Sequence, residues 1–212
     1  MPELILYTNP MSRGRIARWM LEEVGEPYEA RILPFGPPMK TPEYLAVNPM
    51  GKVPSLVHGE TVVTEVGAIC AYLADAFPDA GLAPSAASPE RGAYYRWLFF
   101  AAGPLEAAVT NTSLGWHDPE RSGMLGYGSM AQVLDLLETH LGDGRAFAVG
   151  DAFGAVDVLL GSQLGFGLRF GTIEARPAFE AYVERVTGRP AAVRAGTTDD
   201  ALLAEAQAGS EA

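Results

Sequence analysis

The sequence predicts an α/β domain followed by an all-α domain, and three observations carry this prediction. Strand and helix patterns alternate over residues 1–79, in the order β-α-β-α-β-β-α. Residues 80–87 lie in a stretch rich in Pro, Gly, Ala and Ser, which is typical of a linker. Residues 88–212 contain only helical patterns. We therefore expect two domains, 1–79 and 88–212.

The first strand and helix are marked by clear start and stop signals. Residues 4–7 form a short apolar run that ends before Asn9-Pro10. From Ser12 onward, apolar residues recur at helical spacing until Gly25, which ends the pattern. The following elements of this domain are expected to be a strand at 28–33, a helix at 41–47, strands at 55–57 and 61–64, and a helix at 65–77.

Turn residues separate these later elements. The sequence PFGPP at 34–38 predicts a loop without regular structure. Thr41-Pro42 is typical of a helix N-cap followed by proline at the first helical position. Residues 58–60 are expected to form the turn of an antiparallel hairpin between the two strands that flank them. The helices between the earlier strands imply parallel crossovers. The last helix of this domain is expected to begin at Glu65.

The second domain is predicted to contain only helices. The expected segments are 88–101 with a kink at Gly103-Pro104, 130–141, 156–168, 177–186 and 201–206. Residues 156–168 are apolar on nearly all sides, so they should form the buried central helix.

Composition excludes several classes of protein. A net charge of −11 argues against nucleic acid as a partner, because phosphate binding needs clustered basic residues. Cys70 is the single cysteine, so disulfides within the chain and cysteine metal sites are excluded. His58, His117 and His140 are too scattered to suggest a metal site. We see neither a signal peptide nor a membrane span, and we expect a cytoplasmic protein.

The stretch from residue 48 to 73 carries most of the chemical information. A valine-proline pair, Val53-Pro54, stands beside a strand and offers bent backbone whose polar groups are available to a ligand. The helix that opens at Glu65 adds free N–H groups and partial positive charge. Together they predict a cradle for a peptide with a carboxylate end.

Four motifs in order resemble the cytosolic glutathione transferase superfamily: NPMGKVPSL, TEVGAICAYLADAFP, FAVGDAFGAVDVLLG and RPAFEAYVERVTGRPA. The resemblance covers nearly the whole chain. It implies a thioredoxin-like N-terminal domain joined to a helical domain. The opening LYTNPMSRGRIARWMLEEVG is most similar to the phi-like and theta-like classes, whose catalytic residue is a serine.

The resemblance implies a glutathione transferase, an enzyme of detoxification that adds the glutathione thiolate to small apolar electrophiles. It also implies a homodimer with glutathione as co-substrate. From the resemblance and the composition together, we expect no metal, nucleic-acid or membrane partner. Two alternatives remain open. One is a glutathione-dependent reductase of disulfides or peroxides, and the other is a binding protein of the same fold without catalysis.

Glutathione reacts as its thiolate, so the protein must favour the charged form of the thiol. Ser12 matches the family serine and stands at a helix start, where its hydroxyl can donate a hydrogen bond to sulfur. Taken by itself, a serine in this position is most often an N-cap. Tyr7, near the end of the first strand, and its neighbour Asn9 are rival donors.

The resemblance also implies the residues that bind glutathione. The backbone of Val53 would pair with the cysteinyl part of the peptide, and Pro54 would follow a cis bond. Lys40 and Lys52, the only two lysines, match positions that hold the glycine carboxylate.

Glu65 matches the acidic residue at the γ-glutamyl end, and here the chain departs from the family pattern. The family usually has Ser next, whereas this chain has Val66, which leaves only a backbone N–H for the γ-glutamyl carboxylate. A second departure is Gly154, where a Ser or Thr commonly forms a capping box with the residue matching Asp157. Glycine is also accepted at an N-cap, so that departure concerns folding.

The pocket for the electrophile is expected between the two domains. Its wall residues would be Met11, Phe35, Phe99, Phe100, Trp116 and Tyr127. For each of them, packing in the core or at an interface is the competing interpretation.

Overall fold

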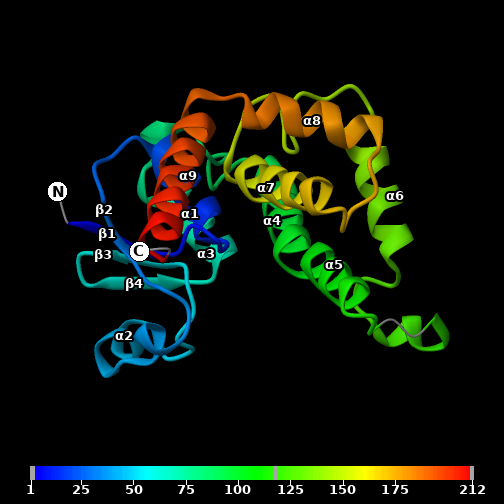
Figure 1. Ribbon diagram of the computed structural model, residues 1–212. Coiled ribbons are helices and arrows are strands. Elements are labelled where there is room, and N and C mark those ends of the chain that lie inside the picture. Colours follow the sequence, from blue (N-terminus) through cyan, green and yellow to red (C-terminus); the bar gives the residue numbers. More distant parts are fainter. Residues whose placement is uncertain (1–2, 117–118, 211–212) are drawn as a thin grey trace. The chain divides into compact units, whose positions relative to one another are not determined.

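The computed structural model describes residues 3–116 and 119–210 and divides into two compact units. The first unit holds the described residues up to Ala80 and from Arg189 onward, and the second holds Gly81–Gly188 (Figure 1). The first unit consists of β1 (Leu4–Thr8), α1 (Gly14–Val24), β2 (Glu29–Ile32), the 3₁₀ turn η1 (Pro37–Lys40), α2 (Pro42–Val47), β3 (Ser55–His58), β4 (Thr61–Thr64), α3 (Val66–Ala76), the 3₁₀ turn η2 (Pro78–Ala80) and α9 (Pro190–Ser210).

The first unit is built on a four-stranded mixed sheet in the order β2-β1-β3-β4. β1 and β2 run parallel, as the helix between them requires, and β3 and β4 form the expected antiparallel hairpin. The predicted element order and α/β class are therefore confirmed. The 34–38 loop differs slightly from expectation, because Pro37 and Pro38 begin η1.

The two faces of the sheet meet different helices. Leu6 and Leu56 are fully buried on the face that also carries Thr8, whose hydroxyl lies against the start of α1. Alternation along a strand places Tyr7 on the opposite face, together with its cross-strand partner Ser55. There the Tyr7 ring lies 5.3 Å from the ring of Tyr44, which α2 contributes.

The last helix, α9, contains the predicted segment 201–206 but begins already at Pro190, so the predicted helix was too short. Its buried stripe consists of Ala191, Ala195 and Asp199, four residues apart. Small and charged side chains do not stand out as an apolar pattern, which is why the first half of the helix was missed. α9 packs along α1 within the first unit (Figure 1).

A buried ion pair joins α9 to α1. Arg18 donates to Asp199 at 2.9 Å, and both residues are nearly fully buried, with 2% and 0% of their surfaces exposed. Arg15 approaches the same carboxylate at 3.9 Å and also pairs with Asp200. Further along, Glu23 accepts two hydrogen bonds from Arg189, each of 2.8 Å. Ion pairs with the C-terminal part of the chain therefore hold α1, the helix that follows Ser12, along its length.

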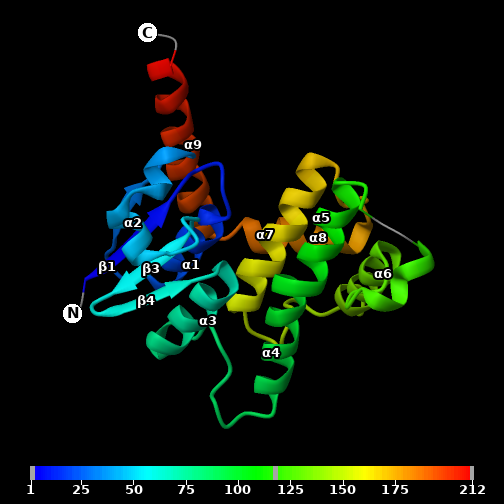
Figure 2. The same ribbon diagram turned by 90° about the horizontal axis from the view of Figure 1, so that it is seen from below.

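The second unit is helical in its described part. Its elements are α4 (Glu90–Phe100), the π-helix η3 (Ala101–Leu105), α5 (Glu106–Ser113), the 3₁₀ segment η4 (Pro119–Met124), α6 (Met130–Leu141), α7 (Ala155–Phe170) and α8 (Pro177–Thr187). The kink predicted at Gly103-Pro104 is realised as η3. α7 is the buried central helix, with α4 running alongside it (Figure 2).

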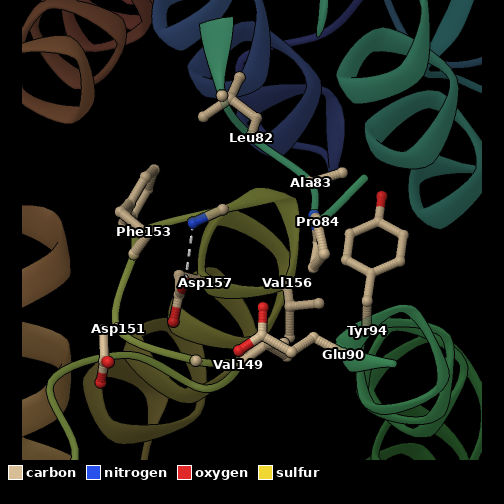
Figure 3. Close-up of a pocket in the computed structure, with 14 residues that line it drawn as sticks. Leu82, Ala83, Pro84, Glu90, Tyr94, Val149, Asp151, Phe153, Val156 and Asp157 are labelled. Carbon is tan, nitrogen blue, oxygen red and sulfur yellow. Dashed lines mark hydrogen bonds between the residues drawn. The ribbon is translucent and has the colours of Figure 1, made fainter. Parts of the chain in front are cut away.

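The start of α7 is fixed by the carboxylate of Asp157. It accepts hydrogen bonds from the backbone N–H of Ala148 at 2.8 Å, from that of Gly154 at 2.9 Å and from the Tyr182 hydroxyl at 2.7 Å. Figure 3 shows the hydrogen bond from the Gly154 N–H to this carboxylate. The N–H of Ala155 donates to the carbonyl of the linker residue Leu82. Gly154 thus serves as the N-cap, as expected.

Candidate functional site

Six of the residues singled out from the sequence line one cavity in the first unit, and four of them are candidates for binding or activating glutathione. Ser12, Lys40, Lys52 and Val53 surround a space of about 370 Å³. They come from the start of α1, from η1 and from the loop before β3. Residues that are distant in sequence therefore meet where the C-terminal end of β1 and the valine-proline loop face each other.

The charge of this cavity suits an anion. Arg13, Lys40 and Lys52 line it, and none of its described lining residues is acidic. A larger cavity of about 660 Å³ lies at the opposite end of β1, but it is lined by Glu3, Glu26 and Glu29 and by none of the predicted site residues. In a chain of net charge −11, the basic cavity is the better place for a carboxylate-bearing peptide.

A third cavity, of about 110 Å³, lies at the start of α7 (Figure 3). Its labelled walls include Glu90, Tyr94 and Asp151, and none of the predicted site residues lines it. The neighbouring Asp157 carboxylate already accepts three hydrogen bonds that fix the helix start. We therefore assign the residues around this cavity a structural role in the second unit.

Ser12 sits between the end of β1 and the first turn of α1. Its hydroxyl accepts a hydrogen bond from the N–H of Gly14 at 2.9 Å and donates one to the carbonyl of Asn9 at 2.7 Å. The same carbonyl also accepts the backbone N–H of Ser12 at 3.0 Å. Ser12 thus has the local bonding of a capping serine while its side chain lines the cavity.

The two rival donors are placed differently. Asn9 is buried, and its amide donates to the carbonyl of Leu33 at 2.8 Å while its oxygen accepts from Met11 N–H at 2.9 Å. The Tyr7 hydroxyl accepts a hydrogen bond of 2.8 Å from Arg31. Neither Asn9 nor Tyr7 is among the residues that line the basic cavity.

Lys40 is held against the loop that it faces. Its ammonium donates to the carbonyls of Met50 at 2.9 Å and Gly51 at 3.1 Å, which leaves one of its three N–H donors for a ligand. Gly51 has φ +57°, and a Cβ there would lie 2.5 Å from the carbonyl oxygen of Met39. Only glycine allows this close approach.

The valine-proline loop has the geometry that the resemblance implies. The Val53–Pro54 bond is cis, and Val53 lies just beyond the Tyr7–Ser55 pair that ends the β1–β3 ladder. Three polar side chains that the sequence analysis did not single out hold this loop from behind: Tyr44, Asn48 and Ser55. Asn48 and Ser55 stand inside NPMGKVPSL, which is the signal that could have found them.

Glu65 and Val66 stand at the start of α3 and do not line the cavity. Glu65 is exposed and has φ +67°, the single positive φ outside glycine among the described residues. Backbone strain of this kind costs about 1–3 kcal/mol and clusters at functional sites. Because Thr64 pairs with Ser55, Glu65 follows directly beside Pro54. The side chain of Val66 is buried.

The residues expected around the electrophile fall in both units. Met11 and Phe35 are exposed and line the basic cavity. Phe99, Phe100, Trp116 and Tyr127 belong to the second unit, where Phe99 and Trp116 are each 70% exposed. Tyr127 accepts a hydrogen bond of 3.0 Å from Asn111. That these residues form one pocket stays a prediction.

Other chemistry finds little support in the described residues. Cys70 is fully buried, and burial raises the pKa of its thiol to about 12, so it stays protonated and unreactive. No group of three or more metal-ligating side chains occurs in residues 3–116 and 119–210; His117 lies outside them. No helix in the same ranges has the length and apolar character needed to cross a membrane.

Comparison with known proteins supplies the family context. A family model described as "Glutathione S-transferase, N-terminal domain" matches residues 11–76. Glutathione S-transferase 3 of Zea mays is 31% identical over 210 residues, which cover 90% of this chain and 92% of the relative. The maleylacetoacetate isomerase of Pseudomonas aeruginosa is 33% identical over 161 residues, covering 72% of this chain and 74% of that protein.

Among solved structures, a sphingomonad glutathione S-transferase complexed with glutathione is similar over most of its length. It shares 27% sequence identity with a TM-score of 0.73, covering 92% of this chain and 98% of the other. The similarity therefore includes both the α/β unit and the helical one.

Proposed function

Because the chain belongs to the glutathione transferase superfamily, we propose that it binds glutathione in the basic cavity and transfers the thiolate to small apolar electrophiles. The meeting of Ser12, Lys40, Lys52 and Val53 around one cavity carries this proposal. Such a peptide requires a hydroxyl that donates a hydrogen bond to its sulfur, two cations for its glycine carboxylate, and backbone polar groups that pair with its cysteinyl part.

In this proposal Ser12 stabilises the thiolate. Its hydroxyl proton turns from the Asn9 carbonyl to sulfur, and the carbonyl keeps the backbone N–H of Ser12 as a partner. A hydrogen bond to a charged group contributes about 1.5–3 kcal/mol, against about 0.5–1.5 kcal/mol for a neutral one. Replacing the neutral hydrogen bond to the Asn9 carbonyl by one to the charged sulfur therefore favours the thiolate. The N–H of Gly14 continues to polarise the hydroxyl oxygen.

The cations and α3 hold the two ends of the peptide. The spare N–H of Lys40 and the exposed ammonium of Lys52 bind the glycine carboxylate. The γ-glutamyl end lies at the start of α3, where Glu65 meets the ammonium group and backbone N–H groups meet the carboxylate. Met11 and Phe35 offer apolar surface to the electrophile.

Turnover with three acceptors tests the proposal and separates it from its alternatives. Glutathione should react with chlorodinitrobenzene faster in the presence of the protein than without it. A preference for a peroxide or a mixed disulfide would favour the reductase instead. Absence of turnover with all three acceptors, together with no retention on a glutathione column, would contradict the enzyme. Retention on the column without turnover would instead favour the binding protein.

Restoring the family serine should tighten glutathione binding. Val66→Ser adds a hydroxyl at the start of α3, and one hydrogen bond to the charged γ-glutamyl carboxylate should lower the Kd for glutathione about tenfold. Val66→Ala removes the same methyl groups without adding a hydroxyl, so it is the matched control in calorimetric titration. Equal affinities of the two variants would contradict the proposed placement of the γ-glutamyl carboxylate.

The resemblance further supports a cytoplasmic detoxification role and a homodimer. Light scattering of the purified protein tests the second point, because a dimer should show twice the mass of the chain. A monomeric mass at working concentration would remove the homodimer from the proposal.

A further inference from the structure

The loop that carries Lys52 and Val53 is held by a buried polar network. Its members are Tyr44 from α2, Asn48 at the end of that helix and Ser55 at the start of β3, with 3%, 4% and 0% of their surfaces exposed. The hydroxyl of Tyr44 and the amide of Asn48, the latter at 2.8 Å, both donate to the carbonyl of Lys52. One donor from α2 and one from its C-cap thus converge on one loop carbonyl.

The donors and acceptors of this network can be assigned from the hydrogen bonds that each group makes. Asn48 Oδ1 accepts the N–H of Met50 at 3.0 Å, so its NH₂ group must face Lys52 and Ser55. The single proton of Tyr44 is committed to the Lys52 carbonyl, so Ser55 donates to the Tyr44 oxygen across 3.0 Å. Burial raises the pKa of Tyr44, which keeps this donor protonated. Only one arrangement satisfies all members.

The network fixes the loop from the side that faces away from the cavity. It draws the carbonyl of Lys52 into the protein, while the side chain of Lys52 and residue Val53 line the cavity. Lys40 fixes the preceding part of the same loop through the carbonyls of Met50 and Gly51. The backbone at Val53 is therefore held in place before any ligand arrives, which lowers the cost of ordering it on binding.

We propose that Tyr44, Asn48 and Ser55 are positioning residues that set the affinity for the peptide part of glutathione and leave activation of its thiol untouched. This inference rests on the proposed function. The separation of the two roles follows from their hydrogen bonds, because the Ser12 hydroxyl bonds to Asn9 and Gly14 and shares no partner with the network.

Tyr44→Phe is the sharpest test. It keeps the ring against Tyr7 and removes the hydroxyl, so Lys52 loses one donor and Ser55 loses its acceptor. The Kd and KM for glutathione should rise about 2- to 10-fold, with kcat and the pKa of the bound thiol unchanged. Tyr72→Phe is the matched control, because its hydroxyl bonds to His58 outside the cavity.

A ligand-free readout keeps the network testable by itself. The N–H of Met50 donates to Asn48, so its hydrogen exchange should be faster in Tyr44→Phe and in Ser55→Ala than in Tyr72→Phe. If the unaltered protein does not bind glutathione, the proposed function fails, and this exchange rate decides whether the network positions the loop. Unchanged exchange, or unchanged affinity when the unaltered protein does bind, would overturn the network. A shift of the bound thiol pKa in Tyr44→Phe would overturn the separation of roles.

Discussion

Ser12→Ala is expected to lower glutathione-dependent turnover by about 10- to 10³-fold, because it removes the hydroxyl that stabilises the thiolate. The substitution leaves the Asn9 carbonyl bonded to the N–H of residue 12 and removes one acceptor from Gly14 N–H. The loss should appear in kcat and in kcat/KM alike. Steady-state kinetics with chlorodinitrobenzene measures it.

Tyr7→Phe is the comparison for this result. The Tyr7 hydroxyl accepts from Arg31 and does not line the cavity, so turnover should stay within about twofold of the unaltered protein. A large loss in Tyr7→Phe with none in Ser12→Ala would assign the donor to Tyr7. If neither variant loses turnover, the side-chain amide of Asn9 or a backbone group becomes the donor.

Asp199→Ala is expected to destabilise the protein by about 3–5 kcal/mol, because it leaves Arg18 as an uncompensated charge in a buried position. The free energy of unfolding in urea, followed by circular dichroism, measures the change. Asp200→Ala is the control, because the Asp200 side chain is 64% exposed and its pair with Arg15 should contribute about 0–1 kcal/mol.

A double substitution separates the charge effect from the packing effect. Arg18→Met combined with Asp199→Leu removes both charges while filling the space, so it should recover most of the stability lost in Asp199→Ala. A loss in Asp199→Ala as small as that in Asp200→Ala would show that the ion pair does not fasten α9 to α1. Recovery would identify the unpaired charge as the cause.

The part of the first unit up to Ala80 could be predicted almost completely because its elements carry local signals. The apolar stripe that ends at Gly25 predicted α1, and Gly25 indeed ends it with φ +80°. Thr41 caps α2 as expected, accepting the N–H of Tyr44. α9 was largely missed, because its buried stripe uses alanine and Asp199, whose role depends on Arg18 far away in sequence.

The site was predictable to the extent that it is written in contiguous motifs. Lys52 and Val53 share NPMGKVPSL, and Ser12 and Lys40 entered through the resemblance to the family. No sequence signal pointed to Tyr44, because periodicity shows which side chains are buried and not which hydrogen bonds they make. The buried partnership of Tyr44 with the Lys52 carbonyl becomes visible only when α2 and the loop are folded together.

The pKa of the glutathione thiol in the complex tests the central claim most directly. Thiolate absorbance of the bound peptide, titrated against pH, should give a pKa well below the ~8.5 of a free cysteine thiol. In Ser12→Ala the pKa should return toward that free value, at about 1.4 kcal/mol for each unit. A bound thiol that titrates like free glutathione in the unaltered protein, or the absence of a complex, would contradict a glutathione-activating site in the basic cavity.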